Sequence, residues 1–261
     1  MTLGFPSGKE GIRKSLVALA LLLSLGGCYW RIAHDPMPFV AYGDLGPEQA
    51  RGAIVLLPGF ADVPQDFDRQ GFVSILRERA PGYDVIAADA HFGYYNNHTL
   101  LDQLHANVIG PLVTRGYREL WILGISMGGH GAVAYARAYP ERIKGLLLFA
   151  PYLGPGEVLQ EVTRAGGICR YTAPVPLPED RFGFAEANFA WLEDVLCSHV
   201  TTVSVWVGVG ERDQMPRALL RAAVAPDHYF VEPGGHEWSA WKPALEKISR
   251  VAFADPSASL R

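Results

Sequence analysis

Short, continuous apolar runs alternate along this chain with longer segments in which apolar residues recur at helical spacing. A short apolar run is typical of a strand buried on both faces, and helical spacing predicts a helix that packs on the sheet. Their alternation predicts an α/β fold, with a mostly parallel sheet and helices on both faces. The expected strands are 53–57, 85–88, 120–123, 145–150, 203–207 and 229–231, and the expected helices are 68–80, 100–113, 129–138, 185–196 and 239–252.

The alternation is interrupted between residues 152 and 202, where glycines and prolines cluster around one expected helix. About fifty residues is too long for a plain connection between two core strands, so we interpret this segment as a cap inserted over the sheet. The sequence then predicts one domain over 52–253, with the cap at about 152–202 and a short tail at 254–261.

The segment Gly124-Ile125-Ser126-Met127-Gly128 has the pattern G-x-S-x-G and stands between an expected strand and an expected helix. A sharp turn between a strand and a helix holds a serine in a strained conformation with its hydroxyl exposed. The flanking glycines remove Cβ atoms that would clash in such a turn. A Gly-rich turn with an incidental serine is the alternative, but the position of the pattern favours Ser126 as a nucleophile.

A serine nucleophile needs a base, and the base needs a group that orients it. His236 follows the last expected strand in a Gly-rich loop, so it can reach the carboxyl edge of the sheet, where Ser126 is expected. His228 precedes that strand and is expected at the opposite edge. Asp213 follows the preceding strand and lies between the serine and the histidine in the chain, which is the order that the orienting acid requires. Glu211 is the alternative acid.

A reaction at a carbonyl develops a negative oxygen, which backbone N–H groups stabilise. We predict that Met127, at the start of the serine helix, and Phe60, after the first buried strand, supply these two groups. Ala61 is the second choice in that loop. A simple turn at Pro58-Gly59 is the alternative reading of the segment.

The N-terminus has the pattern of a secretory signal. Lys9, Arg13 and Lys14 precede an apolar run over 16–23 that is too short to span a bilayer. The following Leu25-Gly26-Gly27-Cys28 resembles the lipobox of bacterial lipoproteins. The resemblance implies a signal peptide over 1–27, a lipid on Cys28 and a tether over 28–51. An ordinary signal peptide with a nearby cysteine is the alternative. We therefore expect a location in the bacterial cell envelope, anchored to a membrane and facing the periplasm or the exterior.

Composition narrows the function further. The 261 residues carry a formal net charge of −4 with no block of lysine or arginine, so nucleic acid is not an expected partner. Cys169 and Cys197 have no C-x-x-C spacing and no neighbouring histidine pair, and we predict neither a metal site nor a cofactor. In an oxidising compartment these two cysteines are expected to form a disulfide across the cap, with two buried free thiols as the alternative.

Over residues 52–253 the chain resembles the α/β-hydrolases. The serine segment continues as Gly129-His130-Gly131-Ala132, and Phe149-Ala150-Pro151 follows the next strand; together they are similar to the esterase D and S-formylglutathione hydrolase group. The resemblance implies Ser126, Asp213 and His236 as the triad. The chain differs from many relatives by having Pro58-Gly59 instead of His-Gly, and little chain precedes Ala53, so the first strands are expected to be shortened or absent.

These observations predict an envelope lipoprotein that is a serine hydrolase of the carboxylesterase type, acting on a small acyl ester. A lipase, a thioesterase or a peptidase would use the same groups, and a non-catalytic binding protein on the same fold is the non-enzyme alternative. Several aromatic side chains are candidates for an acyl pocket, although a core position is the stronger interpretation. They are Tyr94, Tyr95, Phe182, Phe184, Phe189 and Trp191.

Overall fold

A computed structural model of the chain describes residues 31–43, 45–175, 185–198, 200–213 and 217–254. Within them a seven-stranded sheet has the order β1-β3-β2-β4-β5-β6-β7. Strands β2 to β7 run parallel, and β1 is antiparallel to β3 at one edge. The strands are β1 (Phe39–Ala41), β2 (Gly52–Leu57), β3 (Tyr83–Ala88), β4 (Glu119–Ile125), β5 (Gly145–Phe149), β6 (Ser204–Gly210) and β7 (Tyr229–Glu232).

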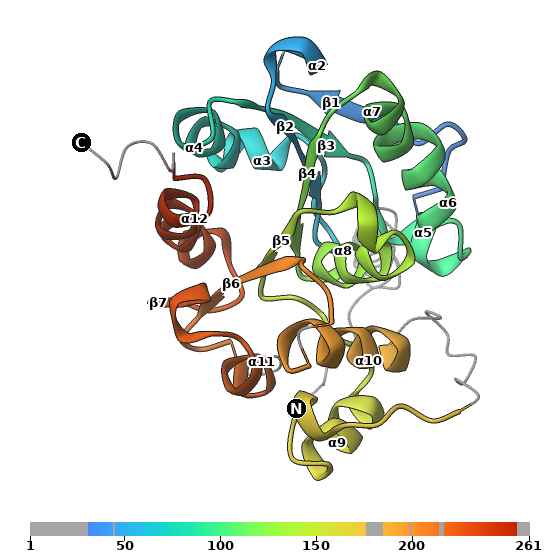
Figure 1. Cartoon of the computed structure of the whole chain (residues 1–261), viewed down its shortest axis with the longest axis vertical. Coiled ribbons are helices and arrows are strands. Elements are labelled where there is room, and N and C mark those ends of the chain that lie inside the picture. Colours follow the sequence, from blue (N-terminus) through green and yellow to red (C-terminus); the bar gives the residue numbers. More distant parts are fainter. Residues whose placement is uncertain (1–30, 44, 176–184, 199, 214–216, 255–261) are drawn as a thin grey trace, which may run out of the picture.

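Helices cover both faces of this sheet (Figure 1). One face carries α3 (Asp66–Arg69), α4 (Phe72–Arg79) and α12 (Trp238–Ala252). The other face carries α5 (Phe92–Asn96), α6 (Leu100–Leu104), α7 (Gly110–Arg115), α8 (Met127–Ala138) and α10 (Ala185–Leu196). The remaining helices are α2 (Gly46–Gln49), α9 (Gly156–Arg164) and α11 (Arg217–Ala223).

Because both faces are covered, the central strands are apolar at successive positions rather than at alternate ones. In β5, Leu146 and Leu148 join the core beneath α8 and α10, whereas Leu147 and Phe149 join the core beneath α4 and α12. All four side chains are fully buried. The continuous apolar runs of the sequence therefore correspond to strands that serve two cores at once.

The expected strands are all present, as β2 to β7, which confirms the predicted α/β class with a mostly parallel sheet. The helix expected over 68–80 is divided at Gly71, whose φ of +82° ends α3 and starts α4. The helix expected over 100–113 passes through a π-helical turn at His105–Ile109 between α6 and α7. Strand β1 lies in the segment expected as a tether, because a strand of three residues carries too little periodicity to predict.

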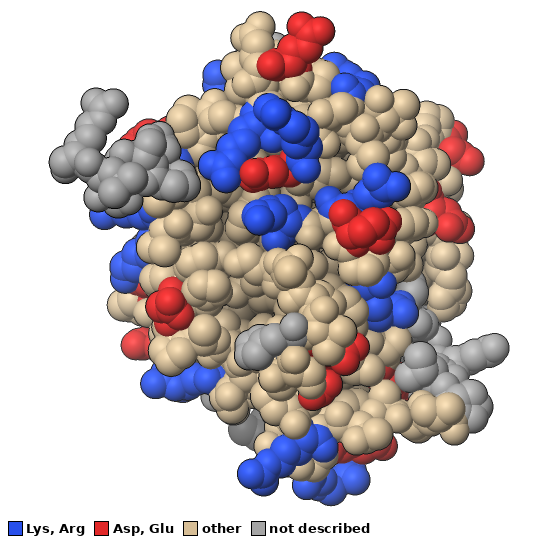
Figure 2. Space-filling view, viewed as in Figure 1, with Lys and Arg blue, Asp and Glu red and all other residues tan. Residues whose placement is uncertain are grey.

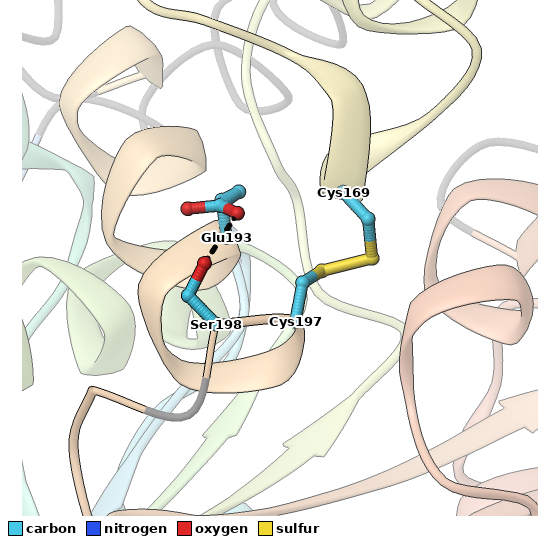
Figure 3. Close-up of a disulfide and its surroundings, with 4 residues drawn as sticks. All are labelled: Cys169, Glu193, Cys197 and Ser198. Carbon is cyan, nitrogen blue, oxygen red and sulfur yellow. Dashed lines mark hydrogen bonds between the residues drawn. A yellow bond between two sulfur atoms is a disulfide. The ribbon is translucent and has the colours of Figure 1, made fainter.

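The insertion between β5 and β6 contains α9, a 3-10 turn at Ile168–Arg170 and α10. Helix α10 buries Phe189, Leu192 and Val195 in the core that it shares with α8. A disulfide joins Cys169 in the 3-10 turn to Cys197 just beyond the end of α10 (Figure 3). The bond ties the first half of the insertion to the helix that packs on the body of the domain.

The surface charges are mixed in sign. Figure 2 shows lysine and arginine gathered over part of the face that it draws, with acidic groups set between them. Elsewhere in the structure, charges of opposite sign are paired, as in the ion pair of Arg51 with Glu119 at 3.1 Å. Neighbouring charges of opposite sign cancel much of each other's field, so this face does not present a single-sign surface.

The disulfide generates a stability prediction. Replacing Cys169 and Cys197 together by serine should lower the free energy of unfolding by about 3 kcal/mol, because the bond spans 28 residues of sequence and restricts the unfolded chain. Urea unfolding followed by circular dichroism measures the change. The wild-type protein unfolded in the presence of a reductant should show the same decrease in the free energy of unfolding. Equal stability of the wild type, the reduced wild type and the variant would contradict the structural role of the bond.

Candidate active site

Ser126 occupies the turn between β4 and α8, with φ +50° and ψ −113°. This conformation is rare for a residue with a side chain and costs on the order of 1–3 kcal/mol. Hydrogen bonds hold it in place: its N–H donates to the carbonyl of Phe149 at 2.8 Å, and its own carbonyl accepts from Gly129 at 3.0 Å and Tyr152 at 2.8 Å. The sequence prediction of a strained serine turn therefore matches the observed backbone.

Glycines are required on both sides of this turn. A Cβ atom on Gly124 would lie 2.4 Å from the carbonyl oxygen of Gly128, and a Cβ atom on Gly128 would lie 2.1 Å from that of Leu57. Real Cβ atoms do not approach backbone so closely, and a contact with backbone is hard to relieve. The close approach places the start of α8 directly against the end of β2.

Asp213 and His236 come from neighbouring loops, after β6 and after β7. The N–H of Glu211 donates to the carbonyl of Glu232 at 2.8 Å, and the N–H of Arg212 donates to that of Gly234 at 2.9 Å. These bonds fasten the two loops together at the carboxyl edge of the sheet. His236 Nδ1 then lies 3.0 Å from Asp213 Oδ1.

The two partners differ in their exposure. The Asp213 side chain is 7% exposed, whereas that of His236 is 49% exposed. The second carboxylate oxygen, Oδ2 of Asp213, is buried with no hydrogen-bond partner within the described part of the chain. When Nδ1 carries the proton and donates to Asp213, the lone pair of Nε2 is left free to accept a proton. Glu211, the alternative acid, is exposed, and the structure brings Asp213 rather than Glu211 to the imidazole.

Ser126, Asp213 and His236 line one cavity of about 320 Å³, which we call the Ser126 cavity. Its volume falls in the range of small-molecule sites. Its other lining residues are largely apolar: Ala150, Pro151, Tyr152, Leu153 and Leu159. A serine, a histidine and an aspartate thus converge on a mainly apolar space, which is a combination of groups that covalent catalysis on a small molecule can use.

The two segments predicted to stabilise a negative oxygen lie beside this turn. Leu57 is paired with Gly124, so the loop after β2 starts next to the turn after β4. Met127 is the first residue of α8, where N–H groups have no partner within the helix. Phe60 lies in the loop after β2; its side chain is 40% exposed and its ring centroid is 4.8 Å from that of Phe92. The assignment of these two N–H groups stays a prediction.

Asp62, in the same loop, is a carboxylate that the sequence analysis did not single out. Its N–H donates to the carbonyl of Gly59 at 3.2 Å. Burial raises the pKa of Asp62 above its usual value, while hydrogen bonds from the Trp238 side chain and the Gly59 backbone and the nearby charge of His236 act against the shift. Its position shortly after a strand that ends beside Ser126 is the sequence signal that points to it.

The remaining candidates among the described residues do not line the Ser126 cavity. His228 stacks on Trp206 and contacts the carbonyl of Val205 through Nδ1, at 3.1 Å, on the amino side of β7 as expected. His130 is buried within α8 and faces Asn188 of α10. The aromatic candidates Tyr94, Tyr95, Phe189 and Trp191 are buried core residues. The proposed lipid site at Cys28 and the aromatic candidates Phe182 and Phe184 lie outside the described residues.

The described residues contain no group of three or more histidine, cysteine, aspartate or glutamate side chains placed to hold a metal ion. They also contain no helix with the length and apolar character needed to cross a membrane.

A family model described as "Putative esterase" matches residues 67–251, which include Ser126, Asp213 and His236. A curated relative, "2-hydroxy-6-oxononadienedioate/2-hydroxy-6-oxononatrienedioate hydrolase" of Paraburkholderia phymatum, is 40% identical over 73 residues. That stretch covers 26% of this chain and 25% of the relative, so the match spans about a quarter of the relative's length.

Solved structures of similar fold cover most of the chain. A ferulic acid esterase matches with a TM-score of 0.56 and 16% identity, over 85% of this chain and 93% of that one. The fluorophosphonate-binding serine hydrolase FphF of Staphylococcus aureus matches with a TM-score of 0.55 and 15% identity, over 84% of this chain and 100% of that one. At such identities the likeness shows the fold alone, which is that of the α/β-hydrolases.

The buried carboxyl of Asp62 generates a prediction about its own titration. The pKa of Asp62 should lie above the usual value of an aspartate, because burial disfavours the charged carboxylate. The chemical shift of the Asp62 carboxyl carbon, followed through pH by NMR, measures the midpoint. A midpoint at or below the usual value would contradict the effect of burial.

Proposed function

Because the chain belongs to this esterase family, we propose that it is a serine hydrolase that cleaves carboxylic esters through an acyl-enzyme intermediate. The observation that carries the proposal is the convergence of Ser126, His236 and Asp213 on one apolar cavity. The strained backbone of Ser126 and the bond between His236 Nδ1 and Asp213 Oδ1 support these roles.

The proposed reaction begins when Ser126 Oγ attacks the ester carbonyl carbon. His236 Nε2 takes the proton from Oγ, and Asp213 stabilises the resulting imidazolium through its bond to Nδ1. The negative oxygen of the tetrahedral intermediate is stabilised by the N–H groups of Met127 and Phe60. The imidazolium then gives its proton to the leaving alcohol, and an acyl group remains on Ser126.

Water completes the cycle by the reverse proton path. His236 is half exposed, so a water molecule can approach it from solvent. His236 takes a proton from this water as it attacks the acyl carbonyl, and returns the proton to Ser126 Oγ when the acid leaves. The burial of Asp213 keeps its charge close to the imidazole and away from bulk water, which strengthens the interaction.

The same groups serve thioesters and amides, so a thioesterase, a lipase or a peptidase is the alternative within the class. A non-catalytic envelope binding protein on the same fold is the alternative outside it. A fluorophosphonate probe separates these classes, because it labels an activated serine and leaves a passive one unlabelled.

Replacing Ser126 by alanine should abolish hydrolysis of short aryl esters, with kcat falling by about four to six orders of magnitude. The fold should be retained, because a smaller side chain fits the same turn. Release of p-nitrophenol from its acetate ester measures the rate, and circular dichroism checks the fold. Near-normal turnover in a folded Ser126→Ala protein would overturn the assignment of the nucleophile.

Two neighbouring carboxylates, Asp213 and Glu211, allow a controlled test of which residue orients His236. Asp213→Asn removes the charge that stabilises the imidazolium, whereas Glu211→Gln changes an exposed carboxylate two residues away. The first variant should lose far more activity than the second. A larger loss in Glu211→Gln would transfer the role to Glu211.

We further propose that the protein is an envelope lipoprotein, anchored to a membrane through a lipid on Cys28. The support is the signal pattern and the lipobox resemblance at the N-terminus.

Replacing Cys28 by serine should prevent attachment of the lipid and block the lipoprotein-type cleavage before residue 28. Several acyl chains together anchor a protein stably, so the wild-type protein should be found in the membrane fraction. Mass spectrometry of the native N-terminus and fractionation of cells provide the measurements. An unmodified Cys28 in the wild-type protein, or cleavage at another site, would exclude the anchor.

A further inference from the structure

A second hollow lies between α9 and α11, next to the Ser126 cavity. It has a volume of about 520 Å³, and we call it the α9–α11 groove. Its lining residues are Gly156, Leu159, Gln160, Thr163, Gly166, Gly167, Ala218, Leu219 and Ala222. None of these described residues carries a charge, and the hydroxyl of Thr163 is already engaged by the carbonyl of Leu159 at 2.7 Å.

The groove borders the Ser126 cavity at Leu159, which lines both spaces. On α9 the lining positions Gly156, Leu159, Gln160 and Thr163 have the spacing i, i+3, i+4 and i+7, so one helix face forms the wall. The opposite wall, on α11, presents small side chains at Ala218 and Ala222. The small side chains of α11 and this face of α9 thus bound an uncharged space that adjoins the cavity of Ser126.

We infer that the α9–α11 groove binds the acyl chain of the ester, and that the preferred substrates carry an unbranched acyl chain of about six carbons or more. This rests on the proposed function, since Ser126 must hold the acyl group. The leaving alcohol has to reach His236, which is half exposed, so it has a direct path to solvent. The acyl group stays on Ser126 until water arrives, and a groove without charges retains an alkyl chain by the hydrophobic effect.

The disulfide supports one end of this groove. Gly166 and Gly167 line the groove and lead directly into the 3-10 turn that carries Cys169. Cys169 is bonded to Cys197 at the end of α10, and α10 packs in the core beside α8 (Figure 3). The wall is therefore fixed to the body of the domain. A fixed wall keeps the length of the groove constant, so the preference should decline once the acyl chain exceeds it.

The test is the dependence of kcat/KM on acyl length, from p-nitrophenyl acetate to p-nitrophenyl decanoate. Each methylene group that enters the groove should raise kcat/KM by about two- to fourfold, the effect of burying one such group. A parallel series of acetate esters with lengthening alkyl alcohols should show a much weaker dependence. A steep dependence on alcohol length with none on acyl length would overturn the assignment of the groove.

Two substitutions fill the groove, Ala222→Trp on α11 and Gln160→Trp on α9. Each should lower the ratio of kcat/KM for decanoate over acetate by about tenfold or more, because the ring occupies the space of several methylene groups. The matched controls are Arg221→Trp and Glu161→Trp, which add the same ring at exposed neighbouring positions outside the groove. The controls should keep the wild-type ratio, and an equal ratio in all five proteins would overturn the inference.

Binding of decanoate, measured by calorimetry, separates this inference from the proposed function. Decanoate should bind the wild-type protein at least tenfold more tightly than Ala222→Trp, and Arg221→Trp should bind as the wild type does. This result together with no ester hydrolysis would reject the proposed catalysis and keep the groove as an alkyl-chain site. Ester hydrolysis without any effect of Ala222→Trp on decanoate binding would keep the catalysis and reject the groove.

Discussion

The site depends first on the close backbone contact between the serine turn and strand β2. Gly128 lies so near the carbonyl of Leu57 that no Cβ atom fits between them. This contact brings the start of α8, where Met127 lies, next to the loop after β2, which carries Phe60. The strain at Ser126 is offset by hydrogen bonds with its neighbours, including the one that its N–H donates to the carbonyl of Phe149. A bulkier residue at Gly128 would separate these parts even though it makes no contact with substrate.

The parallel sheet supplies the second constraint, because it brings the carboxyl ends of its strands to one edge. Loops after β2, β4, β6 and β7 meet there, and they carry Phe60, Ser126, Asp213 and His236 in that order. The chain passes from β2 to β3 on one side and returns to β4 on the other, which opens the crevice where ligands bind in such folds. Hydrogen bonds between the loops after β6 and β7 then set the distance between Asp213 and His236.

The insertion after β5 serves both stability and the proposed specificity. Helix α10 belongs to the core beside α8, so this half of the insertion helps to cover the sheet. Helix α9 contributes Leu159 to the wall of the Ser126 cavity and a face to the α9–α11 groove. The disulfide connects these two halves. The regular alternation of strands and helices is interrupted here because this segment contributes to the core, the disulfide and the groove together. No single hydrophobic periodicity describes all three.

The sequence by itself determined the strands β2 to β7, the α/β class and the serine turn, because each is encoded locally, by continuous apolar runs or by glycines at fixed spacing from Ser126. The positions of Ser126, Asp213 and His236 after three strands also predicted that they meet, since parallel strands place the residues that follow them at a common edge. Only the tertiary structure decided between Asp213 and Glu211 at the imidazole, because both follow the same strand and their difference lies in the bonds between two loops. It alone revealed β1, Asp62 beside His236 and the groove between α9 and α11. These features arise from contacts between residues far apart in sequence, which leave no periodic signal along the chain.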